Sequence, residues 1–185
     1  KKAMGGVNIT ASHNPFGYSG FKFSMHNGAG APIEFTKKIE IHTEKLIARD
    51  WRPRKIVTGT FNCKEFNPTT AYLNRIRKLV DLKKIGQAKL RIAVELMHGT
   101  GRGYLDSLLE EAGTKVIRFN EKLNPLFGGG SPEPNEAGMA EAADFVRQGK
   151  ADLALGLDGD ADRFGIVDKD GTWLNPNEIL TLTLY

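Results

Sequence analysis

The amino-acid sequence predicts an α/β fold in which a parallel sheet is covered by helices, and three observations carry that prediction. From Leu90 onward, short apolar runs alternate with amphipathic segments, an order typical of consecutive βα units. The two amphipathic segments stop at Gly113 and near Gly149, and glycine is a common residue just after a helix. The apolar run that ends at Leu157 leads directly into a polar loop, as expected at the carboxyl end of a parallel strand.

The individual elements after residue 90 follow from the spacing of their apolar residues. Continuous apolar runs predict strands at the ranges 90–96, 116–119, 152–157 and 164–167. Apolar residues at helical spacing predict two helices, one through Tyr104, Leu105, Leu108 and Leu109, the other through Met139, Ala142, Ala143 and Val146. A Gly/Pro-rich connection, 128–132, separates the second strand from the second helix.

Two short sequences organise the end of the chain. Residues 168–171, Asp-Lys-Asp-Gly, have the composition of a tight reversal. Asn175 and Pro176 are the residue types expected at the N-cap and the first position of a helix. We therefore expect a final helix that passes through Ile179 and is still helical where the sequence stops.

The first third of the chain is predicted to hold less structure. We expect strands at 6–10 and 21–25, a helix at 35–48 with Ile39, Leu46 and Ile47 facing inward, and a helix at 68–80 that begins at Asn67 and Pro68. Two strands and one helix before residue 65 can bury little apolar surface. This part is therefore expected to be the end of a domain whose beginning is absent.

Composition favours a soluble, cytoplasmic protein. No apolar run approaches the roughly 20 residues that span a bilayer, and the N-terminus lacks the order of a secretory signal, so no membrane partner is expected. The only cysteine, Cys63, cannot form an internal disulfide, and we expect it to be a buried filler of apolar space.

The net charge of +4 is unevenly distributed along the chain. Through Lys64 there are 11 Lys and Arg against 4 Asp and Glu, and the remainder holds 15 against 18. A basic first part can attract phosphate-bearing ligands. Because its cations are dispersed and rarely alternate with aromatic residues, nucleic acid is not an expected partner.

The most informative sequence is the acidic loop, residues 158–163, Asp-Gly-Asp-Ala-Asp-Arg. In an extended segment Asp158, Asp160 and Asp162 would share one side, where three carboxylates repel one another unless a divalent cation neutralises them. All-oxygen ligands favour Mg²⁺. A solvated acidic turn is the simpler alternative. An EF-hand is excluded, because its sixth and twelfth positions would hold Arg163 and Lys169 in place of glycine and glutamate.

A second polar loop follows the first predicted strand, with the sequence Thr-Ala-Ser-His-Asn-Pro at 10–15. Ser12 could be a nucleophile, a phosphate carrier or a turn-forming residue. A serine hydrolase is disfavoured, since the chain lacks a Gly-x-Ser-x-Gly elbow and His13, as the adjacent residue, is poorly placed to act as a base for Ser12.

Together these loops resemble the α-D-phosphohexomutase family, which includes phosphoglucomutase and phosphomannomutase. The resemblance rests on the sequences at 10–15, 20–22 (Gly-Phe-Lys) and 158–163, and more loosely on 97–103 and 132–134. It implies three-layer α/β/α units with a mainly parallel mixed sheet. It also implies domain boundaries: 1–64 as the end of domain 1, 65–173 as domain 2, and 174–185 as the start of domain 3.

The resemblance implies a composite metal centre. Ser12 matches the serine that carries a phosphoryl group in the resting enzyme. Asp158, Asp160 and Asp162 match the residues that bind Mg²⁺ together with a phosphate oxygen on that serine. The metal would therefore join two loops that lie far apart in the sequence.

Three further residues take implied roles from the same resemblance. Lys22 matches a lysine implicated in proton transfer with the sugar hydroxyl. Arg163 matches an arginine near the phosphoserine, and His13 would lie beside the reacting phosphate in a role that is left open. A lysine that acts in this way needs a pKa well below about 10.4.

The implied activity is the interconversion of hexose 1-phosphate and hexose 6-phosphate, for glucose and/or mannose. Its cofactors would be Mg²⁺ and glucose 1,6-bisphosphate, or the mannose analogue, and its partner a small phosphorylated sugar. Family members are longer, four-domain proteins whose later domains read the sugar, so we expect this fragment alone to be inactive. The sequence does not indicate which sugar phosphate is used, whether of glucose, mannose or glucosamine. It also does not indicate an oligomeric state.

Two other functions remain open at the level of sequence. An aspartate-dependent phosphohydrolase of the haloacid-dehalogenase type also has Asp-x-Asp after an apolar strand. Such enzymes, however, have Thr or Val at the position that Asp162 occupies here. A non-catalytic metal-binding module would use residues 158–162 only to fold the loop. Phosphate on Ser12 or on Asp158 would distinguish the mutase from the phosphohydrolase.

Overall fold

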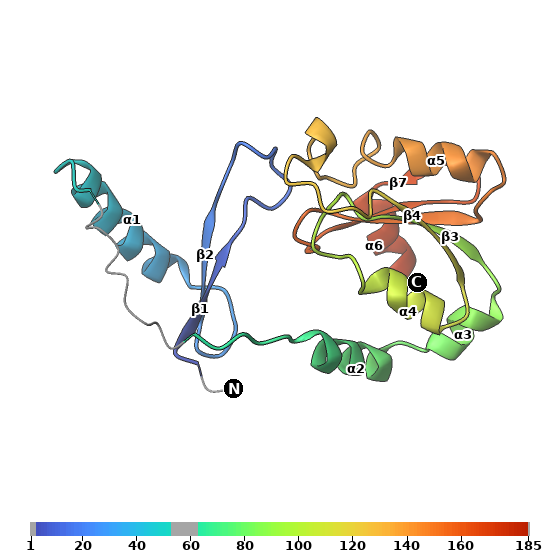
Figure 1. The fold of residues 1–185 in the computed structure, drawn as a ribbon, viewed down its shortest axis with the longest axis horizontal. Helices are drawn as coiled ribbons and strands as arrows, with labels where there is room; N and C mark the ends of the chain where they lie inside the picture. Colours follow the sequence, from blue (N-terminus) through green and yellow to red (C-terminus); the bar gives the residue numbers. More distant parts are fainter. Residues whose placement is uncertain (1–2, 53–62, 185) are drawn as a thin grey trace. The chain divides into compact units, whose positions relative to one another are not determined.

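The computed structural model describes residues 3–52 and 63–184 (Figure 1). The chain divides into two compact units. The first comprises Lys1–Thr10 and Gly20–Asn67, and the second comprises Ala11–Ser19 and Pro68–Tyr185. The serine loop therefore belongs to the same unit as the acidic loop, although the strands on either side of it belong to the other.

The first unit contains an antiparallel hairpin and one helix. Strand β1, Gly5–Ile9, pairs with β2, Phe21–Met25, and α1 follows at Ile33–Ile47. Phe23 and Phe35 stack with their ring centroids 5.1 Å apart. These elements match the predicted strands and helix to within two residues.

The expected burial in this unit is wrong at several positions. No residue of α1 is buried, and Leu46 and Ile47 are 42% and 72% exposed rather than facing inward; Ile39 is half-buried. Cys63 is exposed and so does not fill apolar space. The physical reason is the small number of elements: a hairpin and one helix cannot enclose an apolar face.

The second unit is built on a five-stranded mixed sheet with the order β4-β3-β5-β6-β7. Three strands are parallel, namely β3 at Arg91–Glu95, β4 at Lys115–Phe119 and β5 at Leu153–Leu157. Strands β6, Phe164–Val167, and β7, Trp173–Leu174, continue the sheet antiparallel. The predicted α/β class with a mainly parallel mixed sheet is confirmed.

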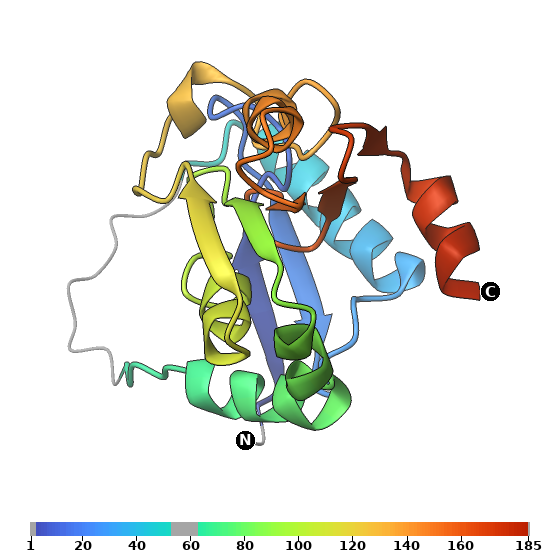
Figure 2. The same ribbon diagram turned by 90° about the vertical axis from the view of Figure 1, so that its right-hand side faces the viewer.

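Helices cover both faces of this sheet, which gives three layers (Figures 1 and 2). Helix α5, Ala140–Arg147, covers one face, and α3, Leu82–Gln87, and α4, Leu105–Glu111, cover the other. Neighbouring residues of β3 point to opposite faces. The α5 side buries Ala93, Met97, Met139, Ala142, Ala143, Val146, Ala151, Ala154 and Val167, and the other side buries Ile92, Val94, Leu96 and Leu109.

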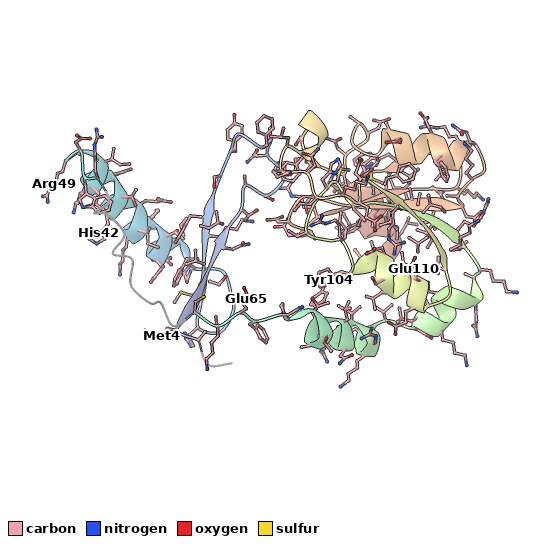
Figure 3. The ribbon with its side chains drawn as sticks, viewed as in Figure 1. Met4, His42, Arg49, Glu65, Tyr104 and Glu110 are labelled. Carbon is pink, nitrogen blue, oxygen red and sulfur yellow. The ribbon has the colours of Figure 1, made fainter. Side chains whose placement is uncertain are left out.

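Helix α2, Thr69–Leu79, is held to α4 at both ends. The Thr69 hydroxyl lies 2.9 Å from the hydroxyl of Tyr104, and Tyr104 stands at the start of α4 (Figure 3). Near the other end, Arg77 forms an ion pair of 2.6 Å with Glu111. The helix begins one residue later than predicted, with Pro68 rather than Asn67 at its N-cap, and it buries only Leu73.

Local signals placed the helix ends correctly. Gly113 and Gly149 follow α4 and α5 with positive φ, at 90° and 69°. The side chain of Asn175 accepts hydrogen bonds from the backbone of residues 177 and 178 at the start of α6, Pro176–Leu184. The tight reversal is present, because the N–H of Gly171 donates to the carbonyl of Asp168 at 2.9 Å.

Three short elements were not predicted, namely α3, β7 and a 3₁₀ turn at Phe127–Gly129. Each is six residues or fewer, so none shows a readable period of apolar residues. Among the described residues, no helix has the length and continuous apolar character that a membrane span requires.

Candidate active site

The acidic loop is folded by its own first carboxylate. Oδ1 of Asp158 accepts hydrogen bonds from the backbone N–H of Asp162 at 2.9 Å and of Arg163 at 3.0 Å. The backbone of Ala161 has a φ of 59°, so this loop is a tight turn rather than the extended segment from which its geometry was predicted. The turn begins directly after β5, at the carboxyl end of a parallel strand, where α/β proteins collect their ligands.

The turn gathers the three carboxylates. Ligand oxygens of Asp158, Asp160 and Asp162 all lie within 4.8 Å of one another. Asp158 is fully buried, and its Oδ2 has no hydrogen-bond partner among the described residues. Burial raises the pKa of Asp158, the charges of the other two aspartates add to this, and the backbone hydrogen bonds from residues 162 and 163 oppose it.

This arrangement fits a hard divalent cation. A buried carboxylate oxygen without a donor has lost its hydration and gained nothing in exchange, which is costly. Three carboxylates so close together also repel one another. An oxygen-coordinated cation removes both costs, and Mg²⁺ prefers carboxylate ligands with positions left for water or phosphate.

A second turn supports the acidic loop from the side of β3. The backbone N–H of Thr100 donates to the carbonyl of Gly159 at 3.0 Å. A Cβ on Gly99 would lie 2.7 Å from that same carbonyl oxygen, so only glycine allows the two turns this approach. The turn is held in place by buried Glu95, whose Oε1 accepts the N–H of Met97 at 2.7 Å; burial raises the pKa of Glu95.

The serine loop packs against the acidic loop. Ser12 has a φ of 54°, an uncommon conformation for a residue other than glycine. A Cβ on Gly159 would lie 3.2 Å from the backbone oxygen of Ser12 and 3.0 Å from Cγ of Pro132. The hydroxyl of Ser131 donates a hydrogen bond to the backbone oxygen of His13. Gly159 is therefore the point at which the backbone next to Ser12 meets the aspartate turn.

The predicted site residues divide between the units. Ser12, His13, the three aspartates and Arg163 are all in the second unit. His13 is half-buried, and its Nδ1 has no hydrogen-bond partner among the described residues. Lys22 belongs to the first unit, on β2, where it pairs in register with Asn8. The structure therefore places six of the predicted site residues in one unit and Lys22 in the other.

Residues 131–134 are also part of the site, although the sequence analysis assigned them no role. The carbonyl of Pro132 accepts the N–H of Gly159 at 3.1 Å, and Oε1 of Glu133 lies 3.4 Å from Nη1 of Arg163. The only signal was the Pro-Glu-Pro sequence at 132–134, in which two rigid residues flank one charge.

Comparisons with known proteins place both units in one group. The sequence profile for phosphoglucomutase/phosphomannomutase, alpha/beta/alpha domain II, matches residues 70–171. The profile for domain I of the same proteins matches residues 1–50.

Relatives of known name agree with the profiles. Phosphoglucosamine/phosphogalactosamine mutase of Sulfurisphaera tokodaii is 32% identical, over 90% of this chain and 36% of that protein. Human phosphoglucomutase-1 is 34% identical, over 96% of this chain and 36% of that protein.

A solved structure shows the same fold. The crystal structure of a Thermus thermophilus protein described as a phosphomannomutase superposes with a TM-score of 0.82 at 31% identity, covering all of this chain and 41% of that one. The chain thus spans well under half the length of these relatives.

Proposed function

The chain belongs to the phosphoglucomutase/phosphomannomutase family, and from that premise we propose that it carries the phosphoserine and metal part of a phosphohexomutase. The reaction is the interconversion of hexose 1-phosphate and hexose 6-phosphate, for glucose and/or mannose. One observation supports this most directly: the serine loop packs on the acidic turn within one unit, with Gly159 against the backbone of Ser12.

Asp158, Asp160 and Asp162 would hold Mg²⁺, and they fit it because Asp158 offers a buried, unpartnered oxygen. When bound, the ion neutralises charge on the phosphate that Ser12 carries. Phosphoryl transfer needs alignment and charge stabilisation more than covalent assistance. A metal and the Arg163 guanidinium on the same turn would supply both.

In the proposed cycle, the phosphoryl group leaves the Oγ of Ser12 and joins a hydroxyl of the sugar monophosphate. The proton of that hydroxyl would leave by way of Lys22, and the Oγ of Ser12 gains a proton in exchange for the phosphoryl group. The product is glucose 1,6-bisphosphate, or its mannose analogue, which turns over and returns its other phosphoryl group to Ser12. His13 is half-buried and follows Ser12 in the sequence; it would lie beside the reacting phosphate, in a role that is left open.

The phosphohydrolase alternative loses its support, because both profile matches are to mutase domains. The substrate would be a small phosphorylated sugar, and the cytoplasm, where such sugars occur, is the proposed setting. Since the chain spans 36–41% of its relatives, we expect these residues to accept a phosphoryl group on Ser12 rather than to complete the isomerisation.

The test is to incubate the chain with ³²P-labelled glucose 1,6-bisphosphate and Mg²⁺ and to locate the label by mass spectrometry. We expect phosphoserine at Ser12, loss of nearly all label in Ser12→Ala, and no loss in Ser19→Ala, a change at an exposed serine of the same loop. Label on Asp158 would indicate the phosphohydrolase chemistry. Equal labelling of wild type and Ser12→Ala would contradict the proposal. That result would favour the alternative in which residues 158–162 form a non-catalytic metal-binding module.

A further inference from the structure

The segment Pro132–Glu133–Pro134 holds one carboxylate between two fixed points. Both prolines are buried. The carbonyl of Pro132 accepts the N–H of Gly159 at 3.1 Å, and the carbonyl of Pro134 accepts Nε1 of Trp173 at 3.0 Å. Because the backbone is fixed on each side of Glu133, the direction in which this side chain leaves the segment is fixed as well.

Glu133 meets the guanidinium of Arg163 in a weak ion pair. Their closest atoms, Oε1 and Nη1, are 3.4 Å apart, and the two side chains are 32% and 49% exposed. The other oxygen, Oε2, accepts from the side chain of Asn135 at a similarly long 3.3 Å. Half-exposed pairs with such geometry contribute little to folding, so stability alone gives no reason for this carboxylate.

The backbone of Arg163 is held by hydrogen bonds, whereas its side chain is half exposed. Its N–H donates to Asp158 Oδ1 at 3.0 Å, and its carbonyl accepts the N–H of Asp158 at 3.3 Å. The guanidinium therefore extends from a point that is fixed on the aspartate turn. Its single ion-pair partner among the described residues is the carboxylate of Glu133.

The pair borders an open hollow of about 460 Å³ beside the aspartate turn, lined by Glu133, Asp162, Arg163, Phe164 and Trp173 among others. A phosphate that enters it can accept two parallel hydrogen bonds from a guanidinium, whereas Glu133 makes one long contact. Phosphate is thus the stronger partner, and the carboxylate is a partner that can be replaced.

We propose that Glu133 is a positioning residue that holds the Arg163 guanidinium while no phosphate is bound and gives it up when a phosphate enters. The inference rests on the proposed function, in which a phosphate is taken up and released in each cycle. A carboxylate that competes for Arg163 lowers the affinity of Arg163 for phosphate. Removal of the Glu133 charge should therefore raise the affinity for phosphate. If Glu133 were only a structural contact, its loss should lower that affinity or leave it unchanged.

The experiment is a calorimetric titration of inorganic phosphate into the chain with Mg²⁺ present. We expect Glu133→Gln to bind phosphate about two to five times more tightly than wild type, and the difference to shrink as salt is raised. The matched control is Glu136→Gln, which removes the same charge three residues further on, at an exposed side chain that borders a different hollow; its affinity should equal that of wild type.

Glu133→Asp is the second variant, because it keeps the charge and withdraws it from Arg163. It should give an intermediate affinity, and circular dichroism checks that each variant is folded. Unchanged or weaker phosphate binding in Glu133→Gln, or no phosphate binding by any variant, would overturn the inference. If Ser12 is labelled by glucose 1,6-bisphosphate in the same preparations, the proposed function survives that failure; if it is not, the function itself has failed.

Discussion

The hydroxyl of Ser131 donates a hydrogen bond to the backbone oxygen of His13, across 118 positions of the sequence. One residue further along, the carbonyl of Pro132 accepts the N–H of Gly159 from the acidic turn. The segment that begins at Ser131 therefore contacts both loops of the candidate site. We expect the relative position of Ser12 and the aspartates to depend on this segment as much as on the loops themselves.

Ser131→Ala removes the bond between the segment and the serine loop. We expect a loss of about 0.5–1.5 kcal/mol in the free energy of unfolding and a lower rate of phosphoryl transfer to Ser12, measured by chemical denaturation and by ³²P labelling. Ser19→Ala, at an exposed serine, is the control and should match wild type. A wild-type labelling rate in Ser131→Ala would show that the bond does not position the loop.

Gly159→Ala places a methyl group where the two loops meet. The new Cβ would lie 3.0 Å from Cγ of Pro132 and 3.2 Å from the backbone oxygen of Ser12, so a neighbour must move. We expect about 1–3 kcal/mol of destabilisation together with weaker Mg²⁺ binding. Gly17→Ala is the matched control, because its Cβ would have no neighbour within 4 Å. Equal melting temperatures for the two variants would refute the close approach.

Mg²⁺ should raise the unfolding temperature of the wild-type chain, since a ligand that binds only the folded state stabilises it. The gain is about 2.7 kcal/mol at an ion concentration one hundred times Kd. Asp158→Asn should abolish this response, as measured by differential scanning fluorimetry with and without Mg²⁺.

The control for the metal prediction is Asp50→Asn. Asp50 has a side chain 88% exposed and a positive φ of 46° that asparagine also tolerates. It should respond to Mg²⁺ as wild type does. A full response in Asp158→Asn would mean that the ion binds elsewhere.

Acid should destabilise the second unit through Asp152. Side-chain and then backbone hydrogen bonds from Arg91 lower the pKa of Asp152 below its ordinary value of 3.8, with Nη2 and Oδ1 2.6 Å apart. A lowered pKa gives stability that is present above about pH 4 and is lost as the pH falls through the folded-state value.

Urea unfolding at pH 6 and pH 3 measures this contribution. Asp152→Asn should lose stability at pH 6 and show a smaller further loss at pH 3 than wild type does. Glu136→Gln, at an exposed carboxylate, should retain the wild-type pH dependence. The same pH dependence in Asp152→Asn as in wild type would assign the acid sensitivity to other carboxylates.

The sequence predicted best those features that depend on neighbours in the chain. Gly113, Gly149 and Asn175 placed helix ends because capping involves only the adjacent turn. Prediction from the sequence failed for burial, because burial depends on segments that are distant in the chain. Leu46 and Ile47 follow Ile39 at helical spacing, much as the apolar residues of α5 follow one another, but α5 buries three of its residues and α1 buries none. The elements α3 and β7 were too short to show a period.

The candidate site divides in the same way. The three aspartates and Ser12 could be selected from the sequence because carboxylates at alternate positions, and a serine on a turn after a strand, are chemical features of single segments. Their mode of assembly could not be predicted. The carboxylates gather through a tight turn closed by Asp158 itself, not through an extended strand.

By itself, the sequence determined the α/β class, the family resemblance and the residue types that could bind a cation and carry a phosphoryl group. Only the tertiary structure decided that Ser12 and the aspartates belong to one unit, that Gly159 is their point of contact, and that Glu133 contacts Arg163. The reason is physical: propensity and capping act within a few residues, whereas packing and hydrogen bonds such as that between Ser131 and His13 join segments whose separation in the sequence carries no signal.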